Sequence, residues 1–193
     1  ADAVACPLPS KGLKGNAPAV VPDPDFELEV GVLTVSDRAA AGVYTDLSGP
    51  EVTSTLEQYA SRTGAWRLRV QRTAIVPDEA SAIQEKITAW SSPENGDAPA
   101  CRLILTTGGT GCAPRDVTPE ATMAVCERLV PGISEAMLLR VARTEPHAML
   151  SRGVAGIRGQ TLVVNLPGRP KAVRENLSVL MPVLKHTMRQ LAG

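Results

Sequence analysis

The sequence predicts an α/β fold with three layers, α/β/α, in which a mainly parallel sheet lies between two layers of helices. Short apolar strand patterns alternate along the chain with amphipathic helix patterns, as in βαβ units. The stretch 102–107 carries a continuous apolar run of the kind found in the middle of a parallel sheet. Polar or glycine-rich loops follow four of the predicted strands. Because ligands of such sheets bind outside the carboxyl ends of the strands, we expect a site at that edge.

Each element is predicted from its period and from the signals at its ends. Strands are expected at 28–37, 66–76, 102–107 and 161–165, with one more short strand before a turn at 157–159. Helices are expected at 48–64, 77–90, 118–129 and 133–145, and from Pro170 to the end of the chain. Ser48 is expected to cap the first helix, and Pro182 to kink or split the last. The buried stripe of the last helix is predicted to be Val173, Leu177, Leu180, Leu184 and Leu191.

The length of 193 residues suits one domain with a tail. Residues 1–25 contain five prolines and little apolar periodicity. They are therefore predicted to be a linker, a tag remnant or a processed leader, with the folded domain at 26–193. A piece cut from a longer multidomain chain would begin in the same way.

Composition argues against several classes of partner. The 20 basic and 20 acidic residues balance, and only one Phe, two Tyr and two Trp occur, so neither a charged surface nor stacking rings predict nucleic-acid binding. No apolar run approaches the roughly 20 residues of a membrane span. The four cysteines form no CxxC pair and have no partner His. Free thiols predict a reducing, cytoplasmic location.

A glycine-rich loop, 108–111, follows the continuous apolar strand. Gly108, Gly109 and Gly111 allow the backbone to approach a ligand and to aim N–H groups at it, and Thr110 adds a hydroxyl. The loop lacks the Lys-Ser/Thr of a P-loop and the spacing of a dinucleotide fingerprint. A tight strand-to-helix turn without a ligand is the alternative. Together with the other polar loops, the glycine-rich loop 108–111 predicts a site for a nucleotide phosphate.

Three carboxylates, Asp46, Asp78 and Asp116, lie in the same set of loops. Taken singly, Asp78 suits a helix cap, and Asp46 and Asp116 suit Asx-turns. Converging on a phosphate loop, they would repel the phosphate unless a cation lay between them. Mg²⁺ is that cation, because it takes a few carboxylates together with phosphate oxygens and water.

Two further segments are candidates for binding anions. The backbone of 165–168, just before the last helix, can meet a phosphate or a purine edge, although an ordinary turn accounts for it equally well. Ser151 and Arg152 can hold a second anionic group, or form a solvated corner. His147 and His186 have no partner spacing and predict surface or packing roles. No motif for covalent catalysis occurs.

These segments together resemble a known family. The stretches "TTGGTG…PRDVTPEAT", "AMLSRGVAGIRG" and "NLPGRP", with "LTVSDR" and "VPDE" upstream, are similar to molybdopterin adenylyltransferases, the MogA-type proteins and the G domains of plant molybdenum-cofactor proteins and of gephyrin. The resemblance covers about 27–191. It implies a homotrimeric α/β domain that transfers AMP from ATP to the phosphate of molybdopterin with Mg²⁺, releasing pyrophosphate. It also implies a molybdate-insertion domain, linked or separate, that takes the adenylylated product.

The resemblance assigns roles residue by residue. It implies nucleotide binding by Gly108, Gly109, Thr110, Asp116, Asn165, Pro167 and Gly168. It implies catalysis by Asp78 and Asp116, with Asp78 holding the metal. It implies contact with molybdopterin by Asp46, Ser48, Ser151 and Arg152. Cys112 and Arg169 depart from the usual residues of the family, which affects the lining of the pocket.

Two rival functions remain open from the sequence. One is a MoaB-type relative, or the corresponding subdomain of a molybdate-inserting enzyme, whose glycine loop usually differs. The other is a gephyrin-like trimeric scaffold that binds molybdopterin without being primarily catalytic. Turnover of ATP with molybdopterin distinguishes these rivals from the transferase.

Overall fold

A computed structural model describes residues 22–23, 25–92 and 100–193. The predicted linker, 1–25, therefore lies outside the described residues except for 22, 23 and 25, and so do residues 93–99, between the helix predicted at 77–90 and the strand predicted at 102–107. Six strands form one sheet in the order β2-β1-β3-β6-β5-β4. They are β1 (Glu27–Val35), β2 (Arg67–Val76), β3 (Leu103–Thr107), β4 (Arg128–Leu129), β5 (Ala155–Arg158) and β6 (Thr161–Leu166). The first four of that order run parallel. β5 pairs antiparallel with β6, and β4 in turn pairs antiparallel with β5.

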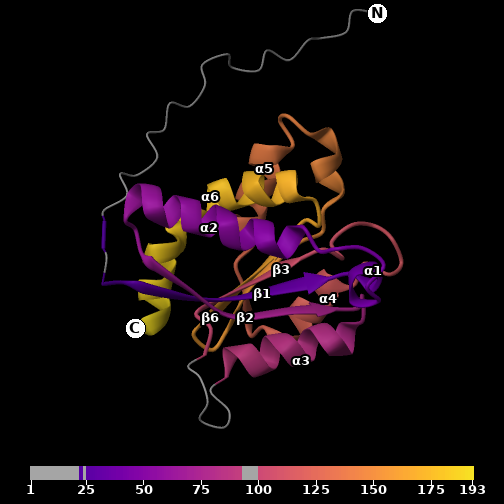
Figure 1. Cartoon of the computed structure of the whole chain (residues 1–193), viewed down its shortest axis with the longest axis horizontal. Coiled ribbons are helices and arrows are strands. Elements are labelled where there is room, and N and C mark those ends of the chain that lie inside the picture. The colour runs from indigo at the N-terminus through magenta and orange to yellow at the C-terminus, as the bar shows by residue number, and fades with distance from the viewer. Residues whose placement is uncertain (1–21, 24, 93–99) are drawn as a thin grey trace, which may run out of the picture.

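Helices cover both faces of this sheet (Figure 1). They are α1 (Asp37–Ala40), α2 (Ser48–Thr63), α3 (Ala80–Ser91), α4 (Thr118–Val125), α5 (Pro131–Val141), the 3-10 helix η1 (Pro146–Leu150) and α6 (Pro170–Ala192). On one face α2 and α5 pack against α6, and on the other α3 packs against α4. The predicted three-layer α/β/α architecture is confirmed.

The alternation of side chains along β3 shows why three layers form. Leu103 and Leu105 belong to the core beneath α2 and α6, while Ile104 belongs to the core beneath α3. Successive strand residues point to opposite faces, so a strand with apolar residues on both faces must be covered on both sides. The predicted stripe of α6 is buried from Val173 to Leu184, and Leu191 is partly buried. No helix in the described ranges is both long and apolar enough to cross a membrane.

Several predicted boundaries were wrong. The helix expected at 118–129 ends at Val125, because Glu127 N–H and Val130 N–H bond to carbonyls of Ile157 and Ala155 and draw the chain into the edge strand β4. The helix expected at 133–145 begins at Pro131 and ends at Val141. Pro182 lies inside α6, so the alternative that it splits the helix was wrong, and the alternative that it kinks the helix stays a prediction. Packing of an amphipathic face outweighs one lost hydrogen bond.

Candidate active site

The carboxyl ends of the four parallel strands meet at one edge, as predicted. Val35 of β1 pairs with Val76 of β2, and Thr107 of β3 pairs with Leu166 of β6. The loops that follow are joined directly, since Ser36 N–H donates to Val76 O at 2.9 Å and Gly108 N–H donates to Leu166 O at 3.1 Å. The loops that sequence analysis selected are therefore neighbours in space.

The surroundings of the loop 108–111 require glycine at two of its positions. Gly108 has φ +101° and Gly109 has φ +60°, in the left-handed region that favours glycine. A Cβ at Gly109 would lie 2.4 Å from Thr118 Oγ1 and 2.9 Å from Asp78 Oδ1. A Cβ at Gly108 would lie 2.2 Å from the carbonyl oxygen of Val35. The loop thus lies against the end of β1 on one side and against a carboxylate on the other.

Asp78 lies beside this loop in a reciprocal pair with Asp37. Its Oδ2 accepts from Asp37 N–H at 2.8 Å, and its own N–H donates to Asp37 Oδ1 at 3.0 Å. Its Oδ1 faces Gly109. The helix predicted to begin at Pro77 begins at Ala80, and its N-cap residue is Glu79, so the alternative that Asp78 caps it is wrong.

Charge and burial set the state of these carboxylates. Burial, followed by the charges of Asp37 and Asp116, raises the pKa of Asp78 above its ordinary value, although the hydrogen bond from Asp37 opposes the rise. Asp37 has the opposite shift, because Arg115 donates to it through Nε at 3.0 Å and Nη2 at 2.8 Å and lowers its pKa. Sequence analysis missed Asp37 and Arg115, although Asp37 follows its strand just as Asp78 does.

Asp116 also faces the glycine loop. Its Oδ2 accepts from Ala113 N–H at 2.9 Å, which is the local turn considered as its structural alternative. The same oxygen would lie 2.9 Å from a Cβ at Gly111. Asp78 and Asp116 therefore flank one short loop, as predicted.

Asp46 does not join them. It accepts from Thr34 Oγ1 at 2.6 Å and from the N–H groups of Ser48 and Gly49 at 2.9 and 3.1 Å. These bonds cap α2, so Asp46 takes the role that sequence analysis gave to Ser48, which is the first residue of the helix. In the described ranges no three His, Cys, Asp or Glu side chains are grouped so that they could hold one metal ion. Asp46, Asp78 and Asp116 therefore do not form one three-carboxylate metal site.

A cavity of about 700 Å³ is bordered by the glycine loop together with residues of α5 and η1. Its lining includes seven residues from the glycine loop, from the segment before β5, from the end of β6 and from the turn before α6: Thr110, Gly111, Ser151, Arg152, Asn165, Pro167 and Gly168. The helix α5 closes it with apolar side chains such as Leu138 and Val141. This size suits a small-molecule or nucleotide ligand.

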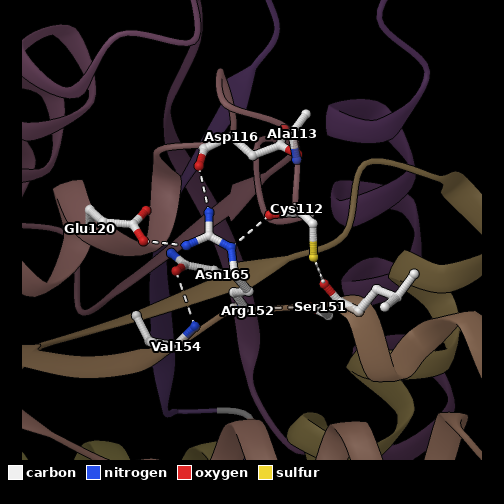
Figure 2. A network of polar contacts seen from close by, with 11 residues as sticks. Cys112, Ala113, Asp116, Glu120, Ser151, Arg152, Val154 and Asn165 are labelled. Atoms are coloured by element: carbon white, nitrogen blue, oxygen red, sulfur yellow. Dashed lines mark hydrogen bonds and ion pairs between the residues drawn. The ribbon is translucent and has the colours of Figure 1, made fainter.

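Two of the predicted residues contribute internal bonds. The Asn165 side-chain amide donates to Thr106 Oγ1 and Thr122 Oγ1, both at 2.9 Å. It also accepts from Val154 N–H at 3.2 Å (Figure 2). Ser48 Oγ donates to the carbonyl of Gly168, which joins the first loop to the last. Asn165 borders the cavity while its amide ties β6 to β3, α4 and the start of β5.

Arg152 points into the glycine loop (Figure 2). Its Nε donates to Gly111 O at 2.7 Å, its Nη2 to Asp116 O, and its Nη1 pairs with the carboxylate of Glu120. Glu120 is a further residue that sequence analysis missed. The corner predicted at Ser151 and Arg152 is thus tied to the proposed nucleotide loop.

The two residues that depart from the family pattern lie at this site. Cys112 is exposed, and its Sγ donates to Leu150 O at 3.4 Å. Arg169 borders the cavity. Of the predicted free thiols, Cys101, Cys112 and Cys126 are free, and Cys6 lies outside the described residues. His147, predicted to have a surface role, is exposed, borders the cavity and contacts Glu145 at 2.9 Å.

The fold and this edge define an α/β domain whose glycine loop lies beside a carboxylate pair and borders a cavity. The profile of the probable molybdopterin binding domain matches residues 31–186, and the chain belongs to that family.

Individual relatives support the assignment. Over 166 residues the chain is 39% identical to the molybdopterin adenylyltransferase of Helicobacter pylori strain J99, with 86% of this chain and 89% of that protein covered. It is 44% identical over 162 residues to gephyrin of Dictyostelium discoideum, with 82% of this chain but only 22% of gephyrin covered. The crystal structure of the molybdopterin biosynthesis enzyme MoaB from Thermus thermophilus superimposes with a TM-score of 0.75 at 42% identity, covering 86% of this chain and 97% of that one.

Proposed function

We propose that this chain transfers AMP from ATP to the phosphate of molybdopterin, in a Mg²⁺-dependent reaction that releases pyrophosphate. The observation that carries the proposal is the glycine loop, in which Gly109 lies beside the Asp78–Asp37 pair while Thr110 and Gly111 border the cavity. Relatives named molybdopterin adenylyltransferase, at 39–45% identity, support it. Nucleotidyl transfer needs positioning and charge neutralisation more than a nucleophilic side chain, and this edge offers backbone donors and carboxylates.

In this reaction a phosphate oxygen of molybdopterin attacks the α-phosphorus of ATP. A new phosphorus–oxygen bond forms as the bond to pyrophosphate breaks. The backbone of Gly108, Gly109 and Thr110 would hold the nucleotide phosphates, and the turn from Asn165 to Gly168 would complete that subsite. Thr110 and Gly168 both border the cavity, and a Cβ at Gly168 would lie 3.4 Å from Gly108 Cα, which supports one shared nucleotide position.

Asp78 is the residue proposed to hold the metal. Its Oδ2 is occupied by Asp37 N–H, whereas its Oδ1 faces Gly109. Burial and neighbouring carboxylates raise its pKa, so a cation at this place would relieve the repulsion between the carboxylates. Mg²⁺ usually binds through one or two carboxylates with phosphate and water, which fits two acidic residues beside a phosphate loop. When bound, Mg²⁺ would neutralise charge on the reacting phosphates, and Asp116 would support the same loop.

The molybdopterin side is proposed at the part of the cavity lining that lies next to the glycine loop, before β5. Ser151 and Arg152 border it there. Arg152 has five N–H donors, and its three internal bonds leave two that could meet an anion. Asp46 and Ser48 do not border this cavity, and their predicted contact with molybdopterin remains a prediction.

Assembly and partners are also part of the proposal. By its resemblance to the family we propose a homotrimer that passes its product to a molybdate-insertion domain, linked or separate. The similarity to MoaB keeps the MoaB-type alternative in view, and the similarity to part of gephyrin does the same for a scaffold.

The test is pyrophosphate release from ATP and Mg²⁺ with and without molybdopterin. We expect release only with molybdopterin present, together with adenylyl-molybdopterin detected by mass spectrometry. A chain that sediments as a trimer, binds molybdopterin and releases no pyrophosphate would be a scaffold instead.

A further inference from the structure

The side chain of Arg152 holds together two ends of one loop. Its Nε donates to the carbonyl of Gly111 at 2.7 Å, and its Nη2 donates to the carbonyl of Asp116. Its backbone N–H adds a bond to Thr110 O at 2.9 Å. Both ends of the segment 110–116 are thus hydrogen-bonded to Arg152, which is distant from it in the sequence.

This geometry suits a brace. The guanidinium group is a rigid plane with donors at fixed angles, so two carbonyls bound to it are held at a set separation. Inside the braced segment, the Asp116 carboxylate bonds to Ala113 N–H at 2.9 Å. Thr110 and Gly111 border the cavity. Movement of Arg152 would therefore change where the loop presents its backbone.

Glu120 fixes the direction of Arg152. It lies in the first turn of α4, and its carboxylate pairs with Nη1 of Arg152 (Figure 2). The side chain of Glu120 is not among those that border the cavity. Any effect of Glu120 on a ligand there must pass through Arg152 or through the fold of α4.

We infer that Glu120 and Arg152 are a positioning pair, which holds the loop 110–116 in the conformation that binds nucleotide. The inference rests on the proposed nucleotide site and gives Glu120 and Arg152 an effect on nucleotide binding that acts through the loop. It differs from the sequence-based expectation for Arg152, which gives that residue a role toward molybdopterin alone. The two roles differ in what they predict for an Arg152 variant. A role toward molybdopterin alone leaves ATP affinity unchanged, whereas the positioning role predicts weaker ATP binding.

The test measures binding of a non-hydrolysable ATP analogue with Mg²⁺ by isothermal titration, in wild type, Glu120→Gln, Arg152→Lys, Arg152→Ala and the double variant Glu120→Gln/Arg152→Ala. Glu120→Gln keeps size and removes charge. Glu51→Gln is the matched control, because it breaks an ion pair with Arg174, at 2.9 Å, whose two residues do not border the cavity. Urea unfolding of every variant separates lost affinity from lost fold.

We expect Glu120→Gln to weaken analogue binding about fivefold, as for a partly exposed ion pair. Arg152→Ala, which loses three bonds, should weaken it about tenfold or more. Arg152→Lys should fall between them, because one ammonium cannot span both carbonyls. The double variant should match Arg152→Ala, since Glu120 acts through Arg152. Glu51→Gln should bind as wild type does.

Three results would overturn the inference. One is unchanged analogue affinity in Glu120→Gln and Arg152→Lys while both remain folded. Another is an effect of Glu120→Gln that persists fully in the Arg152→Ala background. The third is equal weakening in Glu51→Gln, which would show a general loss of stability. If the wild type itself fails to bind the analogue, the proposed function fails, and the inference fails with it.

Discussion

Asp46 and Asp78 are the same residue type at the same edge of one sheet, yet they are used differently. Asp46 accepts three hydrogen bonds, from Thr34 Oγ1 and from the N–H groups of Ser48 and Gly49. Asp78 accepts one, on Oδ2, and its Oδ1 faces Gly109. The carboxylate oxygens of Asp46 are bonded to β1 and to the start of α2, and they stabilise the fold. Asp78 has one carboxylate oxygen facing the glycine loop, where it can bind a ligand.

The largest effect is expected from Asp78→Asn. The amide keeps the shape and can still accept from Asp37 N–H, but it removes the charge proposed to hold Mg²⁺. We expect adenylyl transfer to fall about a hundredfold or more, with molybdopterin binding and unfolding free energy retained. Pyrophosphate release measures adenylyl transfer, and urea titration measures the unfolding free energy. Loss of folding instead would show that Asp78 is structural, like Asp46.

Gly109→Val should have the next largest effect. The new side chain meets Thr118 and Asp78 at a position with φ +60°. We expect ATP binding to weaken about tenfold or more, with little change in molybdopterin binding, and some loss of stability from strain of about 1–3 kcal/mol. Gly159→Ala is the control, because Gly159 has φ +55° and a Cβ there would meet nothing within 4 Å. Equal loss of both ligands in a folded Gly109→Val protein would argue against two subsites.

Asp46→Ala tests the other side of the comparison. It removes the cap of α2 and the acceptor of Thr34 Oγ1. We expect a loss of about 1–2 kcal/mol in unfolding free energy, measured by urea titration. Asp46→Asn should recover most of it, since Asn caps as well as Asp. A raised KM for molybdopterin in Asp46→Asn, with stability unchanged, would instead support the contact predicted from the sequence.

The smallest effect concerns the chain before the first strand. Asp23 contacts Lys185 at 3.1 Å and Arg189 at 2.7 Å, and these contacts tie it to α6. Deleting residues 1–21 should leave the melting temperature and turnover unchanged, as expected for a linker. Deleting 1–25 should lower the melting temperature slightly, because Asp23 is lost. If deleting 1–21 already lowers it, that segment packs on the domain.

The pH dependence of this contact has a defined sign. The hydrogen bond from Lys185 and the charges of Lys185 and Arg189 lower the pKa of Asp23 below its ordinary value. The contribution of Asp23 to stability is therefore present above the pKa that its carboxyl has in the unfolded chain, about 3.9. That contribution is lost as the pH falls through the lower pKa of the folded state. We expect the difference in melting temperature between wild type and Asp23→Asn at neutral pH to shrink in acid. A difference that grows in acid would contradict this assignment.

Much of the fold could be predicted from the sequence because its signals are local. The run around Ile104 identified the central strand, and the polar loops after the strands identified the edge where the cavity lies. The edge strand at Arg128 could not be predicted, because its two residues are fixed by pairing with β5 and not by any period.

The site could be predicted in part for the same reason. Glycines and Asp78 follow strands and can be recognised one loop at a time. Arg115 with Asp37, and Arg152 with Glu120, are pairs separated by 78 and 32 residues in the chain. Their meeting depends on which loops the sheet order brings together. No local pattern shows whether a carboxylate has a helix end or an open loop beside it, which is why Asp46 and Asp78 looked alike.

The most direct test compares Asp78→Asn with Asp46→Asn in one assay, pyrophosphate release from ATP and Mg²⁺ with molybdopterin. Both variants remove one charge and keep one shape. The account predicts a loss of about a hundredfold or more for Asp78→Asn and a much smaller change for Asp46→Asn, at equal folded fractions. Equal losses in the two folded variants, or turnover retained in Asp78→Asn, would contradict it.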